Sequence, residues 1–191
     1  MKFKQLDITG FKSFSEKTTI LIEEGLTGIV GPNGCGKSNI VESLRWCMGE
    51  NSAKSMRGSG MEDVIFAGTS NRPSKNISEV TLLLDNQNKE GPSHYKEFDE
   101  ISVRRKIERD KGSKYYVNDK EVRARDVQTL FADLSTGAHS PSLISQGKIG
   151  QLVTAKPIER KSILEEAAGI SGIHARRQEA ETRLNAAENN L

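Results

Sequence analysis

The sequence has few cysteines, few aromatic residues and no long apolar run. Two cysteines, Cys35 and Cys47, are too few for the disulfide framework of a small secreted protein, so we expect both thiols to be free. No stretch approaches the roughly 20 apolar residues that span a bilayer, and the N-terminus has no apolar run of signal-peptide length. These absences argue against a membrane protein or a membrane partner and predict a cytoplasmic location.

Charge of neither sign dominates, since 28 Lys and Arg residues face 26 Asp and Glu residues, a formal net charge of +2. The chain as a whole is therefore not a polycation built for nucleic acid. Basic residues nevertheless cluster in one part of the chain: Arg104, Arg105, Lys106, Arg109, Lys111, Lys114, Arg123 and Arg125. This cluster is interpreted either as the solvated face of a strand and hairpin or as a surface that contacts phosphates.

Apolar periodicity predicts a mixed α/β fold. Strands are expected at Lys2–Thr9, Thr18–Ile22, Leu26–Val30, Glu79–Leu84, Ile101–Ile107, Lys114–Val117 and Glu121–Val122, and helices at Lys37–Met48 and Arg125–Leu134. The last four strands favour a small antiparallel sheet, with a hairpin turn at Asn118–Lys120. Residues 49–76 form a long irregular stretch, and such stretches inside a domain are often functional.

The C-terminal part changes character, because no strand signal follows Pro157. Apolar residues take most of the heptad positions, with Arg177 in the remaining slot: Ile173, Ala180, Leu184, Ala187 and Leu191. The pattern favours the start of a coiled coil, with an ordinary surface helix as the alternative. It is still running where the sequence stops, so we expect a fragment or a missing partner helix. We divide the chain into a lobe, 1–155, and helices that lead into a coiled coil, 156–191.

Residues 31–38, GPNGCGKS, satisfy the P-loop pattern G-x-x-x-x-G-K-[ST] between a predicted strand and a predicted helix. Its glycines let successive N–H groups turn toward a β-phosphate, and the helix dipole favours the same anion. Lys37 supplies a point charge for the β- and γ-phosphates, and the Ser38 hydroxyl takes one Mg²⁺ position. The motif therefore predicts a site for ATP with Mg²⁺.

Hydrolysis needs more than a P-loop, since water must be oriented and charge neutralised. Gln146, in a loop after a short strand candidate at Leu143–Ile144, is placed to reach Mg²⁺ and the attacking water. VTLLLD, 80–85, imitates a Walker B strand, but Asn86 follows it in place of a catalytic glutamate, so we interpret it as a half-buried sheet strand. LSTG, 134–137, imitates the signature motif of ATP-binding-cassette proteins but precedes Gln146, which is the wrong order.

Several segments together resemble the N-terminal half of the ATPase head of bacterial SMC proteins, the chromosome-organising ATPases. They are LDITGFKSF, GPNGCGKSNIVESLRWCMGE, AKSMRGSGMEDVIFAG, YYVNDKEVR, SLISQGKI and ERKSILEEAAGI, in the expected order over nearly the whole chain. The resemblance implies the N-terminal lobe of an ABC-type P-loop ATPase head, an α/β fold with an antiparallel β subdomain and the start of a coiled coil.

The resemblance also assigns roles to individual residues. Lys12 is implied to approach the phosphates, Arg57 to act as the arginine finger, and Gln146 to bridge Mg²⁺ and water. Without the family likeness, Arg57 would be interpreted as a solvated loop arginine. The nucleotide-binding loop implied by the likeness comprises Pro32, Asn33, Gly34, Cys35, Gly36, Lys37, Ser38 and Asn39.

An SMC head is split, and its C-terminal half supplies the signature motif, the Walker B aspartate and the catalytic glutamate. We therefore expect hydrolysis only in the complete dimer and very little by this chain alone. The implied partners are the C-terminal half of the same head, a second head, a kleisin-type protein with its accessory subunit, and DNA of the nucleoid. Rival interpretations are a split-head repair ATPase of the Rad50/SbcC or RecN type, a free-standing P-loop kinase that uses Asp85, and a non-catalytic dimerisation module.

Overall fold

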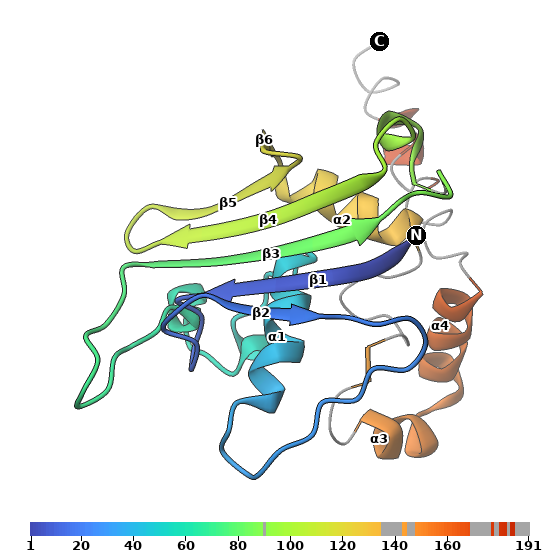
Figure 1. Cartoon of the computed structure of the whole chain (residues 1–191). Coiled ribbons are helices and arrows are strands. Elements are labelled where there is room, and N and C mark those ends of the chain that lie inside the picture. The colour runs from blue at the N-terminus through green and yellow to red at the C-terminus, as the bar shows by residue number, and fades with distance from the viewer. Residues whose placement is uncertain are drawn as a thin grey trace.

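The structure is a computed structural model that describes residues 1–89, 91–134, 143–144, 148–168, 177, 180–182 and 184–185. Figure 1 shows a sheet with helices behind it and two further helices beside it. The strands are β1 (Lys2–Thr9), β2 (Thr18–Leu21), β3 (Ile77–Asp85), β4 (Glu100–Glu108), β5 (Gly112–Val117) and β6 (Lys120–Val122). The helices are α1 (Lys37–Cys47), α2 (Ala124–Asp133), α3 (Lys148–Thr154) and α4 (Pro157–Ala167), with short 3₁₀ turns η1 (Lys54–Met56), η2 (Met61–Val64) and η3 (Ser93–Tyr95).

The sheet is antiparallel, in the order β2-β1-β3-β4-β5-β6. One row of paired residues crosses four strands, from Leu6 through Leu82 and Val103 to Val117, and every side chain in it is buried. Period-two alternation places such rows on one face of a sheet. The strand interpretation of VTLLLD is thereby confirmed, because β3 lies between β1 and β4 and buries alternate residues.

Helices α1 and α2 cover the same face of the sheet, behind it in Figure 1. The apolar face predicted for the second helix is confirmed, since Val127, Leu130 and Phe131 are buried. Cys47, at the end of α1, donates its thiol proton toward the carbonyls of Val103 (3.3 Å) and Val80 (3.5 Å). Burial raises the pKa of the Cys47 thiol to about 12, so this cysteine is a packing residue held in its neutral form.

The basic cluster is split between the two faces of the sheet. Arg104 lies on the open face, where its guanidinium stacks on Tyr116 (4.4 Å) and pairs with Asp119 (2.9 Å). Arg105 points the other way and is only 2% exposed. The interpretation of the whole cluster as one surface was therefore wrong for Arg105, because neighbouring residues of a strand face opposite sides.

Arg105 is a buried cation that joins β4 to the C-terminal end of α1. It donates hydrogen bonds to the carbonyls of Trp46 (2.8 Å) and Glu50 (2.7 Å), and its guanidinium lies between the rings of Trp46 (4.4 Å) and Tyr115 (4.6 Å). Desolvation lowers the pKa of Arg105 below its usual value, while nearby Tyr115, Cys47 and Glu50 oppose the shift. The negative end of the α1 dipole and the two carbonyls compensate the charge.

Two predicted strands are wrong. Leu26–Val30 has no regular secondary structure, and Leu26 (97%) and Val30 (92%) are exposed. A strand forms only against a hydrogen-bonding partner, and none of the described strands pairs with this segment. Leu143 and Ile144, the described residues of the second candidate, are likewise outside any strand.

Helix α4 lies within the C-terminal part that is expected to be helical, 156–191, whereas α3 lies at the end of the predicted lobe, 1–155. Of the predicted heptad positions, Ile173, Ala187 and Leu191 lie outside the described residues, while Arg177 pairs with Glu181 one turn on at 2.8 Å. The coiled coil and the division at residue 155 therefore stay predictions. None of the helices in the described part has the length and apolar content to span a bilayer.

Candidate nucleotide-binding site

The glycine loop ends where α1 begins, as the motif predicts. Gly34 and Gly36 have positive φ angles of 81° and 93°, a left-handed backbone that L side chains rarely adopt. A Cβ at Gly36 would also lie 2.7 Å from Ser13 Oγ, so this glycine is required twice over. The loop thus delivers the first N–H groups of α1 to solvent, where an anion can bind them.

Lys37 turns its ammonium back over the loop. It donates to the carbonyls of Gly31 and Pro32, both at 2.6 Å, and its Nζ lies 3.9 Å from the exposed Cys35 thiol. These carbonyls are uncharged acceptors, whereas phosphate oxygens are anionic, so a hydrogen bond from the ammonium to phosphate adds an ion pair that the carbonyls cannot supply. The lysine is therefore placed to exchange loop carbonyls for phosphate, and Ser38 is exposed beside it on the first turn of α1.

Two of the predicted cations meet at one carboxylate. Glu42, on the second turn of α1, accepts from Lys12 Nζ through Oε2 and from Arg57 Nε through Oε1, the latter at 2.5 Å. Lys12 also donates to the carbonyl of Met56. Arg57 Nη2 donates to Asn39 Oδ1 at 2.8 Å, and Asn39 in turn donates to Ser13 Oγ at 2.9 Å. The nucleotide loop, residues 11–14 and residues 56–57 are thereby joined.

Backbone hydrogen bonds join these loops to each other, and a ring contact packs them against α1. Lys12 N donates to Val64 O (2.7 Å) and Phe66 N to Gly10 O (2.8 Å). Phe11 lies 5.4 Å from Trp46 of α1, ring centroid to ring centroid. The part of the irregular stretch that includes Val64 and Phe66 is thus held beside residues 10–12.

Asp63 closes the turn that follows Arg57. Its Oδ2 accepts from the backbone N–H groups of Ser59 (2.7 Å) and Gly60 (3.0 Å) and from the Ser59 hydroxyl (2.8 Å). These bonds, above all the one from Gly60, lower the pKa of the Asp63 carboxyl below its usual 3.8. The charged form of Asp63 therefore stabilises the loop.

The structure brings together Lys12, Asn39 and Arg57 and places Lys37 and Ser38 at the start of the same helix. Gln146 lies outside the described residues, so its predicted role at Mg²⁺ stays a prediction. Sequence reasoning missed Glu42. A signal existed, because Asn39, Glu42 and Trp46 recur at i, i+3 and i+7 and form one stripe of α1, the stripe that faces both loops.

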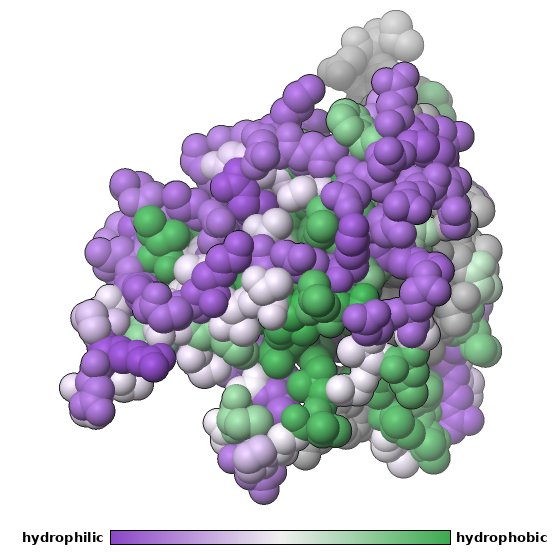
Figure 2. Space-filling view, viewed as in Figure 1, coloured by the Kyte–Doolittle hydropathy of each residue, from purple (hydrophilic) through white to green (hydrophobic). Residues whose placement is uncertain are grey.

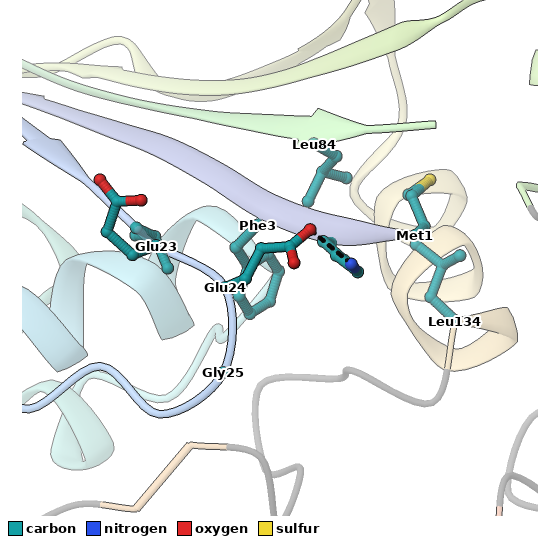
Figure 3. A pocket seen from close by; sticks show the side chains of 9 residues that line it. Met1, Phe3, Glu23, Glu24, Gly25, Leu84 and Leu134 are labelled. Carbon is teal, nitrogen blue, oxygen red and sulfur yellow. Dashed lines mark hydrogen bonds and ion pairs between the residues drawn. The ribbon is translucent and has the colours of Figure 1, made fainter. Parts of the chain in front are cut away.

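A cavity formed by described residues lies elsewhere. It measures about 270 Å³ and is lined by residues of β1, β3 and the chain after β2, including Phe3 and Leu84, and by Leu134, which follows α2. Figure 3 shows the Lys2–Glu24 ion pair (2.6 Å) across it. None of its lining residues belongs to the predicted site, which is an open surface loop.

Comparison with known proteins identifies the family. The model of the RecF/RecN/SMC N-terminal domain matches residues 2–148. The chain belongs to this family. The glycine loop, Lys12, Glu42 and Arg57 all lie within the matched residues. Membership implies a nucleotide-binding head, which agrees with the P-loop at the start of α1.

Curated relatives narrow the resemblance to SMC proteins. The chain is 59% identical over 191 residues to the chromosome partition protein Smc of Cereibacter sphaeroides and 57% identical to that of Rhodopseudomonas palustris. Each match covers 100% of this chain and 17% of the relative. The predicted likeness to an SMC head is confirmed, and the repair-ATPase alternative is not favoured.

Solved structures give the same fold. A crystal structure of an Smc head bound to the C-terminal winged-helix domain of ScpA has a TM-score of 0.81 and 31% identity, covering 90% of this chain and 52% of that one. A structure from work on ATP-driven dimerization and DNA-stimulated activation of SMC ATPases has a TM-score of 0.73 and 30% identity, covering 87% of this chain and 99% of that one. The predicted fold class, the N-terminal lobe of an ABC-type head, is confirmed.

Proposed function

We propose that this chain is the nucleotide-binding N-terminal half of an SMC head and binds ATP with Mg²⁺ to drive head engagement in chromosome partition. The observation that carries the proposal is the P-loop itself. Lys37 holds loop carbonyls at 2.6 Å at the N-terminus of α1, within a chain 59% identical to a chromosome partition Smc. Bonds from the ammonium to anionic phosphate oxygens would replace these bonds to uncharged carbonyls.

The residues present fit a Mg²⁺ ion that arrives with its nucleotide. No group of three His, Cys, Asp or Glu side chains in the described ranges forms a metal cluster by itself. Ser38 supplies a hydroxyl at the expected P-loop position, and phosphate oxygens complete the shell of such an ion. Gln146 is the further ligand that the SMC likeness implies. Bound Mg²⁺ would neutralise charge on the β- and γ-phosphates.

The rest of the head would come from a C-terminal half. The chain spans about 17% of its curated relatives, and Leu21, Leu26, Ile29 and Val30 expose large apolar side chains. Figure 2 shows hydrophobic side chains gathered between the β2 edge and α3. Such a patch is typical of an interface. We assign to it the C-terminal half, which would also give residues 26–30 the strand partner they lack.

The further partners follow the same reasoning. The Smc head solved with a ScpA winged-helix domain supports a kleisin-type partner, with its accessory subunit, for the complete protein. The work on ATP-driven dimerization supports a second head, with ATP between the two, and DNA as activator. A nucleoid-associated location in the cytoplasm agrees with these partners.

The test is reconstitution of ATP turnover. The chain is mixed with the C-terminal half of its parent protein, and ATP hydrolysis is measured with and without DNA. We expect turnover only in the mixture, lost in Lys37→Ala and weakened in Arg57→Ala. Undiminished turnover by the chain alone would defeat the split head and favour a free-standing P-loop enzyme. A Lys37→Ala variant identical to the wild type in nucleotide binding and assembly would favour a dimerisation module.

A further inference from the structure

The carboxylate of Glu42 is placed where it controls two cations at once. Its side chain is 10% exposed, and its two oxygens are divided between partners, Oε2 to Lys12 and Oε1 to Arg57. A buried carboxylate is costly unless it is paired, and this one is paired twice. The cluster therefore carries one net positive charge beside the N-terminal half of α1.

The two cations differ in what remains available to a ligand. Lys12 is 14% exposed and divides its ammonium between Glu42 and the Met56 carbonyl, so its charge is committed to the protein. Arg57 is 58% exposed. Glu42 takes its Nε–H and Asn39 one Nη2–H, which fixes the plane of the guanidinium and leaves an outward edge for an anion.

Backbone geometry points to the same three residues. Lys12 and Arg57 both have left-handed backbones, with φ angles of 46° and 54°, which residues other than glycine seldom adopt. Such strain persists where surrounding contacts over-determine a conformation, and it gathers at functional sites. Glu42 is the contact that the two strained residues share.

We propose that Glu42 is a positioning residue that holds Arg57, braced by Lys12, in the orientation in which its guanidinium meets the γ-phosphate. This inference rests on the proposed function, because the phosphate is that of the bound nucleotide. Because both oxygens of Glu42 pair with Lys12 and Arg57, Glu42 acts through Arg57 and not on the nucleotide itself. Its removal therefore disturbs the orientation of Arg57 and leaves the glycine loop and Lys37 in place.

The first test is kinetic and uses the chain reconstituted with its C-terminal half. Glu42→Gln keeps the size of the side chain and removes its charge. A misplacement of about 1 Å costs on the order of 100-fold in rate, so we expect kcat to fall about 10- to 100-fold. KM for ATP should change less than about threefold, because Lys37 and the loop are untouched. Glu42→Asp should recover part of the rate, and Glu50→Gln, a buried carboxylate beyond the far end of α1, is the matched control.

A double-mutant cycle separates positioning from general destabilisation. In an Arg57→Ala background, Glu42→Gln should change kcat less than about twofold, since the residue it positions is gone. The proposal would be overturned if the kcat losses of the two single variants multiplied independently in the double variant. It would also be overturned if Glu50→Gln lowered kcat as much as Glu42→Gln does.

The second test does not depend on turnover. Arg57 Nε–H is observed by ¹⁵N NMR in the chain and assigned by its loss in Arg57→Lys. We expect a resolved, slowly exchanging signal that Glu42→Gln abolishes and Glu50→Gln preserves. An Arg57 signal unchanged by Glu42→Gln overturns the positioning role. If reconstituted wild-type heads fail to hydrolyse ATP while this signal behaves as expected, the proposed function fails and the Glu42–Arg57 link stands.

Discussion

Arg104 and Arg105 offer a matched test of how burial changes the value of a charge. They are neighbours on β4, yet Arg105 is buried between Trp46 and Tyr115 and Arg104 lies on the open face. Replacing each by methionine removes the same charge from the same strand. The two variants therefore differ only in the environment that the guanidinium leaves.

The magnitude follows from the contacts. Arg105→Met leaves the carbonyls of Trp46 and Glu50 without this donor, at about 1–3 kcal/mol each, and loses two cation–π contacts worth about 1 kcal/mol each. The methionine variant does not have to bury a charged guanidinium, and this offsets several kcal/mol of the loss. The free energy of unfolding should therefore fall by roughly 3 kcal/mol. Arg104 gives up partly exposed pairs with Asp119 and Glu79, worth about 0–1 kcal/mol in total, and one stack on Tyr116, worth about 0.5–1 kcal/mol.

Urea unfolding, followed by circular dichroism and by the fluorescence of the single tryptophan, measures both losses. With a slope of about 2 kcal/mol/M, the midpoint should fall roughly 1.5 M for Arg105→Met and less than about 1 M for Arg104→Met. Equal shifts, or a larger one for Arg104→Met, would refute the argument that the α1 carbonyls and the two rings make Arg105 a structural cation.

Three further predictions concern the cysteines, an acidic cap and a glycine. Cys35 should react with a thiol reagent in the native chain and be protected by Mg²⁺–ATP, whereas Cys47, with a pKa of about 12, should react only after unfolding. If nucleotide does not slow the reaction of Cys35, the proposed site is contradicted. Because the folded pKa of Asp63 is lowered, its contribution to stability is complete above pH 3.8 and is lost as the pH falls through the folded pKa, so Asp63→Asn should flatten the acid limb of an unfolding-versus-pH curve. Gly36→Ala should abolish nucleotide binding measured by calorimetry, because its Cβ meets Ser13 Oγ and its φ is 93°, while Gly28→Ala, with nothing within 4 Å, should not.

Patterns among residues close in sequence were sufficient to predict most of the helices and strands. Alternation located β3 and β4 to within two residues at each end, because each buries every second side chain. The hairpin turn predicted at Asn118–Lys120 is one residue shorter, because Lys120 belongs to β6; Asn118 and Asp119 adopt the positive φ angles, 47° and 61°, that a two-residue hairpin needs. The glycine loop was found because its chemistry depends on residues adjacent in sequence.

Long-range pairing explains what was missed. Leu26–Val30 has the composition of a strand, but composition does not supply a neighbouring strand. Arg105 was counted with its neighbours by charge, although alternation with Val103 and Ile107 already placed it inward. Glu42 meets Lys12 and Arg57 across 30 and 15 residues of chain, so only the folded loops reveal that one carboxylate serves both.

The way α1 is held has a mechanical consequence. Its 11 residues span about 16 Å, with Lys37 at one end and Arg105 of β4 bound to carbonyls at the other. Because Arg105 holds the C-terminal end of α1, the helix cannot tilt without distorting the sheet. A displacement of the Lys37 end of α1 is therefore transmitted to β4 in the middle of the sheet, so that the glycine loop and β4 move together.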